Sequence, residues 1–146
     1  MKKEHIDIWL KTGALRNKQK DKEKIKSMLD SADINAKVTK AIKLNDDTAT
    51  LIFREIYESV RQLGDVKWGI LGFEPCNHEV SMEILKEFEI KDKVKLNSLD
   101  WFKRTRHDIN YRGFRTSIYQ TKEILDFWDK CGEEILIILR KELENS

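Results

Sequence analysis

The scarcity of turn-forming residues constrains the fold of this chain more than any other feature. In 146 residues there are one proline and six glycines, whereas 37% of the residues are charged. Sandwiches, barrels and disordered chains use proline and glycine heavily, and ordinary domains carry about 25% charged residues. Because domains cluster at roughly 100–150 residues, the chain has room for one core only. We therefore expect a single domain over residues 1–146, an all-α up-and-down bundle of about five or more helices.

The sequence carries no pattern for a membrane span or a secretion signal. No run approaches the ~18–20 apolar residues that cross a bilayer, and the early apolar patch Ile6 to Leu10 is too short for a signal peptide. We expect a cytoplasmic protein in which Cys76 and Cys131 are reduced and structural. Cys76-Asn77-His78 has no matching ligand cluster elsewhere for a zinc site, so no metal and no cofactor are expected.

Apolar spacing predicts helices in the first third of the chain. A lysine-rich amphipathic helix is expected over Arg16 to Ser31. The segment Asp33 to Asn45 is interpreted as a connector. Within it Ile34, Val38 and Ile42 repeat every four residues, a spacing that would suit a further helix.

A stronger helix pattern lies in the middle of the chain. Asn45 to Thr48 supply N-cap oxygens, an apolar stripe follows at spacings of three and four, and Gly64 stands where a left-handed C-terminal cap belongs. A helix is therefore expected over Thr48 to Leu63. The apolar stretch Val66 to Phe73 fits either a helix broken at Gly72 or an irregular buried connector.

Capping residues predict two further helices. Asn77 can cap the first, and Ser98 can cap the second after a charged loop at Glu89 to Lys95. Gly113 then ends the second helix or the turn that follows it.

The longest apolar pattern lies in the last part of the chain. It opens at Thr116 or Ser117 and suits a long bundle helix or a packing surface between two chains. Gly132 within it argues against one straight rod. Its apolar positions, spaced by three, four or seven, are Ile118, Leu125, Trp128, Ile135, Leu139 and Leu143.

Positive charge concentrates in one segment, Lys103 to Arg115. It holds five Lys/Arg and one Asp, a net +4, which is twice the +2 of the whole chain. Arg104 stands where it can pair with Asp108. Helical spacing sorts the other side chains onto two adjacent faces, Phe102 with Arg106 and Asn110, and Lys103 with His107 and Tyr111.

Several enzyme classes are not expected. The chain has no glycine-rich phosphate loop, no His-Glu-x-x-His and no acidic quartet for two-metal catalysis. Its near-neutral total charge also argues against broad, nonspecific coating of nucleic acid. The basic segment therefore predicts one localised contact with an anionic ligand.

The hexapeptide Arg106-His107-Asp108-Ile109-Asn110-Tyr111 resembles the signature of HEPN domains. These are small helical bundles whose name refers to nucleotide binding, and the pattern of predicted helices agrees with that family over most of the chain. The resemblance implies a homodimer in which two copies of the motif meet in a cleft, often with a nucleotidyltransferase partner encoded alongside. Many members are metal-independent endoribonucleases, including toxins of toxin–antitoxin systems.

The chain departs from the family's ribonuclease motif at one position. That motif is an arginine followed, after four to six residues, by a histidine; if Arg106 is the arginine, the nearest such position holds Tyr111. A histidine with a pKa near ~6.5 suits proton transfer at neutral pH, whereas a tyrosine near ~10 stays protonated. The candidate catalytic residues Arg106, His107 and Tyr111 therefore favour binding over cleavage.

We expect the chain to bind a nucleotide or an RNA phosphate in the dimer cleft. Arg106 would contact phosphate, Tyr111 would stack or hydrogen-bond, and the neighbouring arginines would supply a positive field. The expected ligand-binding residues are Arg104, Arg106, His107, Asp108, Asn110, Tyr111, Arg112 and Arg115.

Two other functions stay open at the level of sequence. One is a metal-independent endoribonuclease toxin that uses Arg106 with His107 or Tyr111. The other is an interaction protein without a ligand, in which the motif only builds a dimer and Arg106 satisfies carbonyls between helices. His78, which follows a capping residue, is expected to make a capping or core contact.

Overall fold

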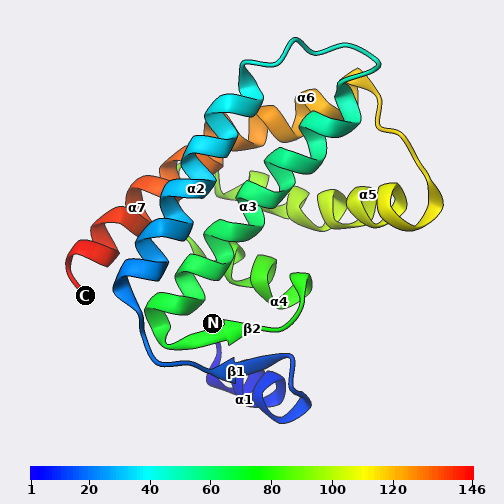
Figure 1. Cartoon of the computed structure of the whole chain (residues 1–146). Helices are drawn as coiled ribbons and strands as arrows, with labels where there is room; N and C mark the ends of the chain where they lie inside the picture. Colours follow the sequence, from blue (N-terminus) through cyan, green and yellow to red (C-terminus); the bar gives the residue numbers. More distant parts are fainter.

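The computed structural model describes all 146 residues and confirms the all-α fold class. Helices make up most of the chain, with one small two-stranded sheet (Figure 1). In chain order the elements are α1 (Lys3–Thr12), β1 (Leu15–Asn17), α2 (Lys22–Lys40), α3 (Ala49–Leu71), β2 (Phe73–Pro75), α4 (His78–Glu83), α5 (Leu99–Arg112), α6 (Ile118–Phe127) and α7 (Glu133–Glu144). Short 3-10 segments cover Ile84–Glu87 and Lys93–Ser98, and a π-helical segment, Trp128–Gly132, joins α6 to α7.

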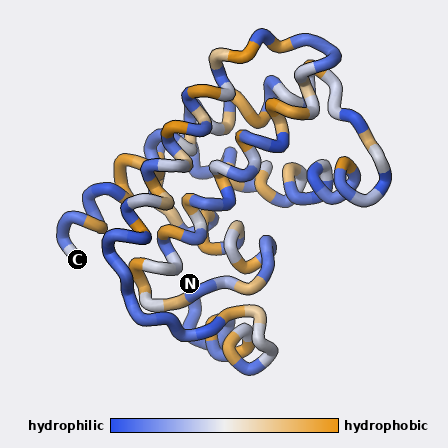
Figure 2. Tube along the Cα trace, in the orientation of Figure 1, coloured by the Kyte–Doolittle hydropathy of each residue, from blue (hydrophilic) through white to orange (hydrophobic).

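The helix α3 forms the centre of the bundle. It packs against α2, α4, α6 and α7, and its predicted apolar stripe, from Ile52 to Leu63, is buried. In Figure 2 apolar and hydrophilic residues alternate along the long helices, as expected for helices that bury one side. The core therefore lies around α3, on the faces that the sequence pattern assigned.

The predicted end of this central helix at Gly64 is wrong. The helix continues to Leu71, and its left-handed cap is Gly72, with a φ of 90°. Gly64 lies inside the helix because α4 crosses there: a Cβ on Gly64 would stand 1.8 Å from the backbone oxygen of Ser81. The glycine therefore permits a close approach of two helices. The stretch from Val66 is the last part of α3, which ends at Leu71 before its cap Gly72, and Phe73 begins β2.

The predicted bounds of the lysine-rich helix are also wrong. α2 begins at Lys22, where the Asp21 side chain accepts a hydrogen bond from the Lys24 amide, and it continues without a break to Lys40. The connector predicted over Asp33 to Asn45 is therefore mostly the second half of α2. Ile34 and Val38 of the four-residue repeat face outward, whereas Ile42, beyond the end of α2, packs partly buried against the core. The core side of α2 is formed by another set of residues: Ile25, Leu29, Ala32 and Ala36.

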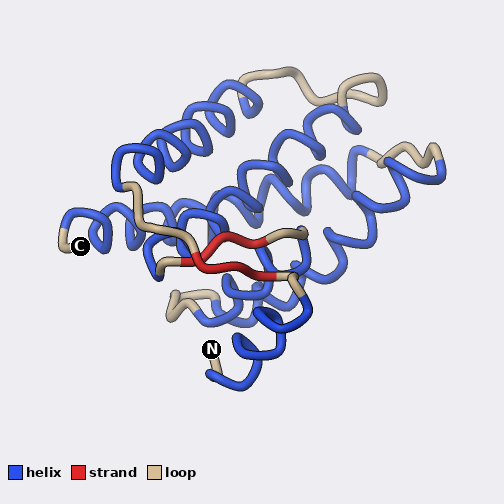
Figure 3. The backbone as a smooth tube through the Cα atoms, turned by 60° about the horizontal axis from the view of Figure 1, so that its bottom comes forward, coloured by secondary structure: helices blue, strands red, loops and turns tan.

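The two strands were not anticipated from the sequence. They pair antiparallel, with Leu15 opposite Pro75 and Asn17 opposite Phe73 (Figure 3). A small apolar cluster beneath them holds α1 against the bundle, with the Trp9 ring 6.0 Å from the Trp68 ring. The sheet thus ties the start of the chain to the end of α3.

Caps in the second half of the chain agree with the sequence in part. Asn77 caps α4 by accepting a hydrogen bond from the Val80 amide at 2.9 Å, as predicted. Ser98 precedes α5 but makes no side-chain cap bond, so that prediction is wrong. The charged loop ends earlier than expected, because a 3-10 segment begins at Lys93.

The last helical run bends where its glycine predicted. Ser117 opens it with a capping box shared with Gln120. Gly132 closes the π-helical segment, and a Cβ there would stand 2.7 Å from the Trp128 ring. The apolar stripe from Trp128 to Leu143 is buried, so it packs into the core of this chain.

The two cysteines are both free but have different surroundings. Cys131 is buried in the core, where desolvation raises the pKa of its thiol to about 11. Cys76 is exposed, so the structural role predicted for it is wrong. None of the helices combines the length and the apolar composition that crossing a membrane would take.

Candidate anion-binding groove

The helix α5 carries most of the basic segment and is anchored by its apolar side. Phe102 is buried between Phe53 and Phe127, with ring centroids 6.1 Å and 5.4 Å away in edge-on contacts. Ile109, on the same face of α5 and closer to its end, is also buried. Because these contacts fix the rotation of α5, its charged side chains face outward. Gly113 ends the helix with a φ of 66°, as predicted.

Arg106 lies at the boundary between the core and the surface. Its guanidinium stands over the ring of Tyr57, 5.4 Å from the centroid, and it forms no ion pair in the structure. Tyr57 is buried in α3, and that burial raises the pKa of its hydroxyl to about 12. Arg106 is therefore held by a cation–π contact and keeps its charge available to a ligand.

His107 and Tyr111 are in ring-to-ring contact on the adjacent face of α5. Their ring centroids are 4.8 Å apart, and Tyr111 is 74% exposed. This proximity confirms the face that the sequence assigned to them. The two rings are tilted by 40° to one another, and Tyr111 presents its ring to solvent.

The predicted pair between Arg104 and Asp108 does not form. Asp108 instead meets Arg112, whose Nε lies 3.8 Å from the carboxylate. Both pairs have the same spacing, but an acid that precedes its base along a helix is the more favourable order. Asp108 therefore partly neutralises Arg112 and leaves Arg104 without an ion-pair partner.

An open groove, which we call the α5 groove, lies where α3, the start of α4 and α5 meet. Its lining holds two permanently positive side chains, Lys103 and Arg106, and no carboxylate. The complete lining is Tyr57, Asn77, His78, Lys103, Arg106, His107 and Tyr111. A groove of this charge favours an anion.

A second hollow shares Lys103 and His107 with the α5 groove but has a balanced charge. Its three cations, Lys103, Arg104 and Arg112, face three carboxylates, Glu79, Asp100 and Asp108. Another hollow, between the start of α2, α3 and β2, has a net negative lining, because two lysines, Lys18 and Lys24, face three carboxylates, Asp21, Asp65 and Glu74. The α5 groove is therefore the better candidate for binding an anion.

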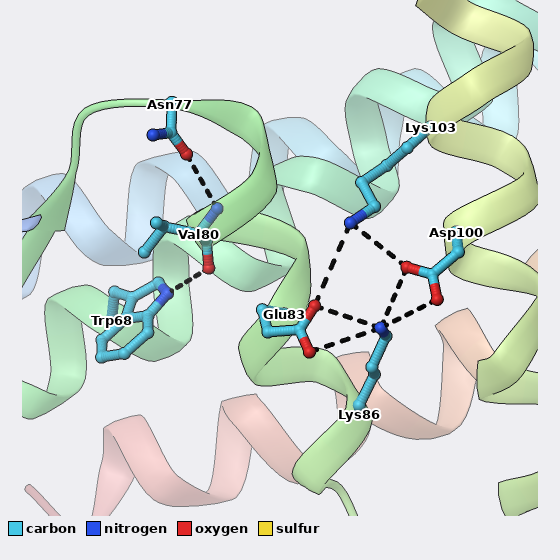
Figure 4. A network of polar contacts seen from close by, with 7 residues as sticks. All are labelled: Trp68, Asn77, Val80, Glu83, Lys86, Asp100 and Lys103. Atoms are coloured by element: carbon cyan, nitrogen blue, oxygen red, sulfur yellow. Dashed lines mark hydrogen bonds and ion pairs between the residues drawn. The ribbon is translucent and has the colours of Figure 1, made fainter. Parts of the chain in front are cut away.

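Lys103 is positioned and partly neutralised by an ionic network between α4, the 3-10 segment that follows it and α5, so Arg106 is the cation of the groove that has no ion-pair partner. Its Nζ lies 3.2 Å from Asp100 and 4.0 Å from Glu83, and Lys86 bridges the same two carboxylates at 2.9 Å and 3.1 Å (Figure 4). The hydrogen bond from Lys86 lowers the pKa of Asp100. In the same view Trp68 donates to the Val80 carbonyl, so the cap of α4 is fixed on both sides.

The groove collects some of the predicted ligand residues and omits others. Arg106, His107 and Tyr111 line it, whereas Asn110 and Arg115 line neither hollow on α5. Arg115 lies beyond α5, where its guanidinium donates to the Asp47 carbonyl at 3.2 Å.

Sequence reasoning missed three residues of the groove. Tyr57 was not considered, Lys103 was placed on a face without a role, and His78 was assigned to a cap or core contact. His78 is half-buried, with its ring 6.3 Å from that of Tyr57. Its place after the helix cap Asn77 was the only sequence signal, and it does not reveal which helix the ring faces.

The groove offers no metal-binding cluster. No three His, Cys, Asp or Glu side chains gather anywhere in the fold in a way that would hold a metal ion. Comparisons with protein-family models, curated proteins and solved structures found no match to this chain.

Proposed function

We propose that this chain binds the phosphate of a nucleotide or an RNA in the α5 groove, as a HEPN-type module. The observation that carries the proposal is the charge of that groove, which has two cations and no carboxylate in its lining. The resemblance to HEPN domains supports it, since the hexapeptide from Arg106 to Tyr111 lies on the same part of α5.

Each side chain of the groove has a role in this proposal. Arg106 and Lys103 contact the phosphate, because charged donors form the strongest hydrogen bonds to phosphate oxygens. The exposed ring of Tyr111, in contact with the ring of His107, accepts a base, and one stacked base contributes about 1–3 kcal/mol. Arg104 adds positive field from beside the groove.

The proposed module acts as a homodimer, and a nucleotidyltransferase partner follows from the resemblance alone. Exposed aromatic side chains surround the turn between α5 and α6: Tyr111, Phe114 and Tyr119. Large exposed apolar groups gathered around one turn are typical of an interface. A second copy that covers this turn would narrow the opening of the α5 groove.

Binding is tested with Arg106→Ala. Loss of a charged hydrogen bond to phosphate, worth about 1.5–3 kcal/mol, should weaken the affinity for a short labelled single-stranded RNA about tenfold or more. Fluorescence anisotropy measures this affinity, and AMP is tested as a competitor. Lys141→Ala, which removes one exposed charge from α7, is the matched control and should bind as wild type.

A conservative variant separates binding from architecture. Arg106→Lys keeps a charge over Tyr57 and should bind better than Arg106→Ala. Equal RNA affinity in wild type and Arg106→Ala would contradict the proposal. Equal affinity together with a dissociated dimer would favour a protein whose motif only builds an interface.

A metal-independent ribonuclease is the second candidate. The observation that favours it is that two imidazoles, His78 and His107, line the same groove as Arg106. In such a reaction one group takes the 2′-hydroxyl proton as that oxygen attacks phosphorus, and another protonates the departing 5′-oxygen. Arg106 would stabilise the charge that develops on the phosphate.

Cleavage is tested directly on purified protein. The ribonuclease hypothesis predicts cleavage of single-stranded RNA that persists in EDTA and is lost in His107→Ala. Intact RNA after prolonged incubation with excess protein would exclude this activity. Binding without cleavage is the result that the first proposal predicts.

A further inference from the structure

His78 is the residue of the α5 groove whose surroundings its position in α4 does not explain. It is the first residue of α4, yet its backbone neighbour Asn77 already provides the cap, so the imidazole has no capping duty. The ring instead lies beside Tyr57 and lines the groove with Arg106. The His78 ring therefore lies where side chains of α3 and α5 meet the start of α4.

The two nitrogens of this imidazole are in different states. Nδ1 is fully buried and has no hydrogen-bond partner, whereas Nε2 is not buried and also makes no hydrogen bond. Because neither nitrogen has a partner within the chain, no hydrogen bond holds the ring in one protonation state. A ligand in the groove can reach the free Nε2.

Charged groups face the ring from two helices. Arg106 on α5 and Arg61 on α3 are positive, and Glu58 on α3 is negative but is itself ion-paired with Arg61. Burial, followed by the two arginines, lowers the pKa of His78, while Glu58 opposes them. Burial and the two arginines therefore favour the uncharged form of the imidazole in the unliganded protein.

The remaining titratable groups of the groove are few. Lys103 and His107 on α5 and Tyr57 on α3 complete the lining, and Tyr57 stays protonated because burial raises its pKa to about 12. No carboxylate lines the groove that could hold a proton on His78. An anionic ligand would supply the missing negative charge.

We propose that His78 contacts the phosphate bound in the α5 groove and takes up a proton when that phosphate binds, so that affinity increases as pH falls. This inference rests on the proposed binding function and deepens it. A phosphate between Arg106 and His78 offsets the repulsion between the two cations, because it is negative and close to both. The proton that is taken up binds the exposed Nε2, and the protonated ring then donates from Nε2 to a phosphate oxygen as a cation, which makes a strong hydrogen bond.

The sign of the effect follows from linkage. Binding raises the pKa of His78, so affinity increases as pH falls below the pKa of the bound state and levels off below the lower pKa of the free state. Each unit by which the ligand raises that pKa gives about a tenfold gain in affinity at low pH. The experiment therefore measures the gain in RNA affinity between high and low pH.

The experiment follows RNA affinity between about pH 8 and about pH 5.5, the range in which imidazoles titrate. The probe is a short labelled single-stranded RNA without a terminal phosphate, because a terminal phosphate has its own pKa near ~6. Wild type should bind about tenfold more tightly at the acidic end. His78→Gln, which keeps a neutral hydrogen-bonding side chain, should lose this gain, whereas His107→Gln in the same groove should keep it.

A second measurement needs no variant. Proton NMR of the imidazole resonances of wild type, assigned by comparison with His78→Gln and His107→Gln, gives the pKa of His78 with and without the RNA. If a variant misfolds, the resonances are assigned through their bonds in isotope-labelled wild type. The expected result is a higher pKa for His78 in the complex.

The outcomes separate this inference from the function on which it rests. A pH dependence that survives unchanged in His78→Gln, or a pKa of His78 that the RNA does not raise, would overturn the inference while leaving Arg106-dependent binding intact. RNA affinity that does not depend on Arg106 at any pH would overturn both. Loss of the pH dependence in His107→Gln alone would assign proton uptake to His107 and so overturn the role of His78.

Discussion

Gly64 makes the closest approach to another helix of any glycine in this chain. A Cβ at this position would stand 1.8 Å from the backbone oxygen of Ser81, and a backbone atom cannot turn aside as a side chain can. Sequence alone suggested a helix end here, because glycine is common at that position. Glycine is instead required at position 64 because α4, which begins 14 positions further along the chain, crosses α3 there.

Gly64→Ala is expected to destabilise the fold strongly. Separating α3 from α4 to admit the methyl group should cost about 3 kcal/mol or more, at the upper end of overpacking effects. Urea denaturation followed by circular dichroism measures the free energy of unfolding. Gly69→Ala is the matched control in the same helix, because its Cβ meets only side-chain atoms of Ile25, Cγ1 at 3.1 Å and Cδ1 at 3.2 Å, and no backbone atom. A Gly64→Ala variant as stable as Gly69→Ala would refute the contact.

At the residue scale Arg106 and His78 differ in how well sequence predicted them. Arg106 belongs to a recognisable hexapeptide on one helix, so local spacing was enough to select it. His78 lies on another helix, and only the packing of α4 against α3 and α5 brings its ring to the groove. Local patterns contain no information about such contacts.

At the scale of elements, the positions of helices were predicted better than their ends. The sequence identified the apolar faces of α3, α5 and the last helical run, since burial follows helical periodicity. It misplaced both ends of α2 and the end of α3. Helix ends depend on which residues can make caps and on what the neighbouring segment does, and both are decided by tertiary contacts.

Two serines at helix starts give a matched test of capping. Ser117→Ala should lower the free energy of unfolding by about 1 kcal/mol, because the Ser117 hydroxyl accepts from the Gln120 amide at 3.1 Å in a complete capping box. Ser98→Ala should change it little, since Ser98 makes no cap bond. Denaturation curves of the two variants and wild type provide the comparison. Equal losses in both variants would mean that these cap geometries do not determine stability.

At the scale of the whole molecule, the fold places its exposed aromatic side chains around one turn. Tyr111 and Tyr119, 74% and 70% exposed, flank the connection from α5 to α6, away from α1 and the small sheet (Figure 1). The homodimer that we propose would use this turn. The surface lies directly beside the α5 groove, so assembly and ligand binding would affect the same helix.

Tyr119→Lys tests that dimer. A lysine in place of this ring should weaken dimerisation about tenfold or more, as expected when an aromatic anchor of an interface is lost. The variant helix should remain stable, because Tyr119 is 70% exposed and its ring takes no part in the core. Sedimentation equilibrium measures the association.

Ile8→Lys is the control for this measurement. Ile8 is also an exposed apolar residue, but it lies on α1 at the other end of the molecule (Figure 1). The Ile8→Lys variant should dimerise with the same affinity as wild type. A wild-type protein that sediments as a monomer at all concentrations would contradict the proposed dimer.

The sequence by itself determined the helical class, the buried faces, several caps and the basic stretch on α5. These depend on spacing and composition within one segment, so they can be inferred without knowing what the segment packs against. Only the tertiary structure decided where α2 and α3 end, why Gly64 is required, and that His78 and Lys103 meet Arg106 in one groove without a carboxylate. Those features arise from contacts between residues far apart in the chain, which no local pattern encodes.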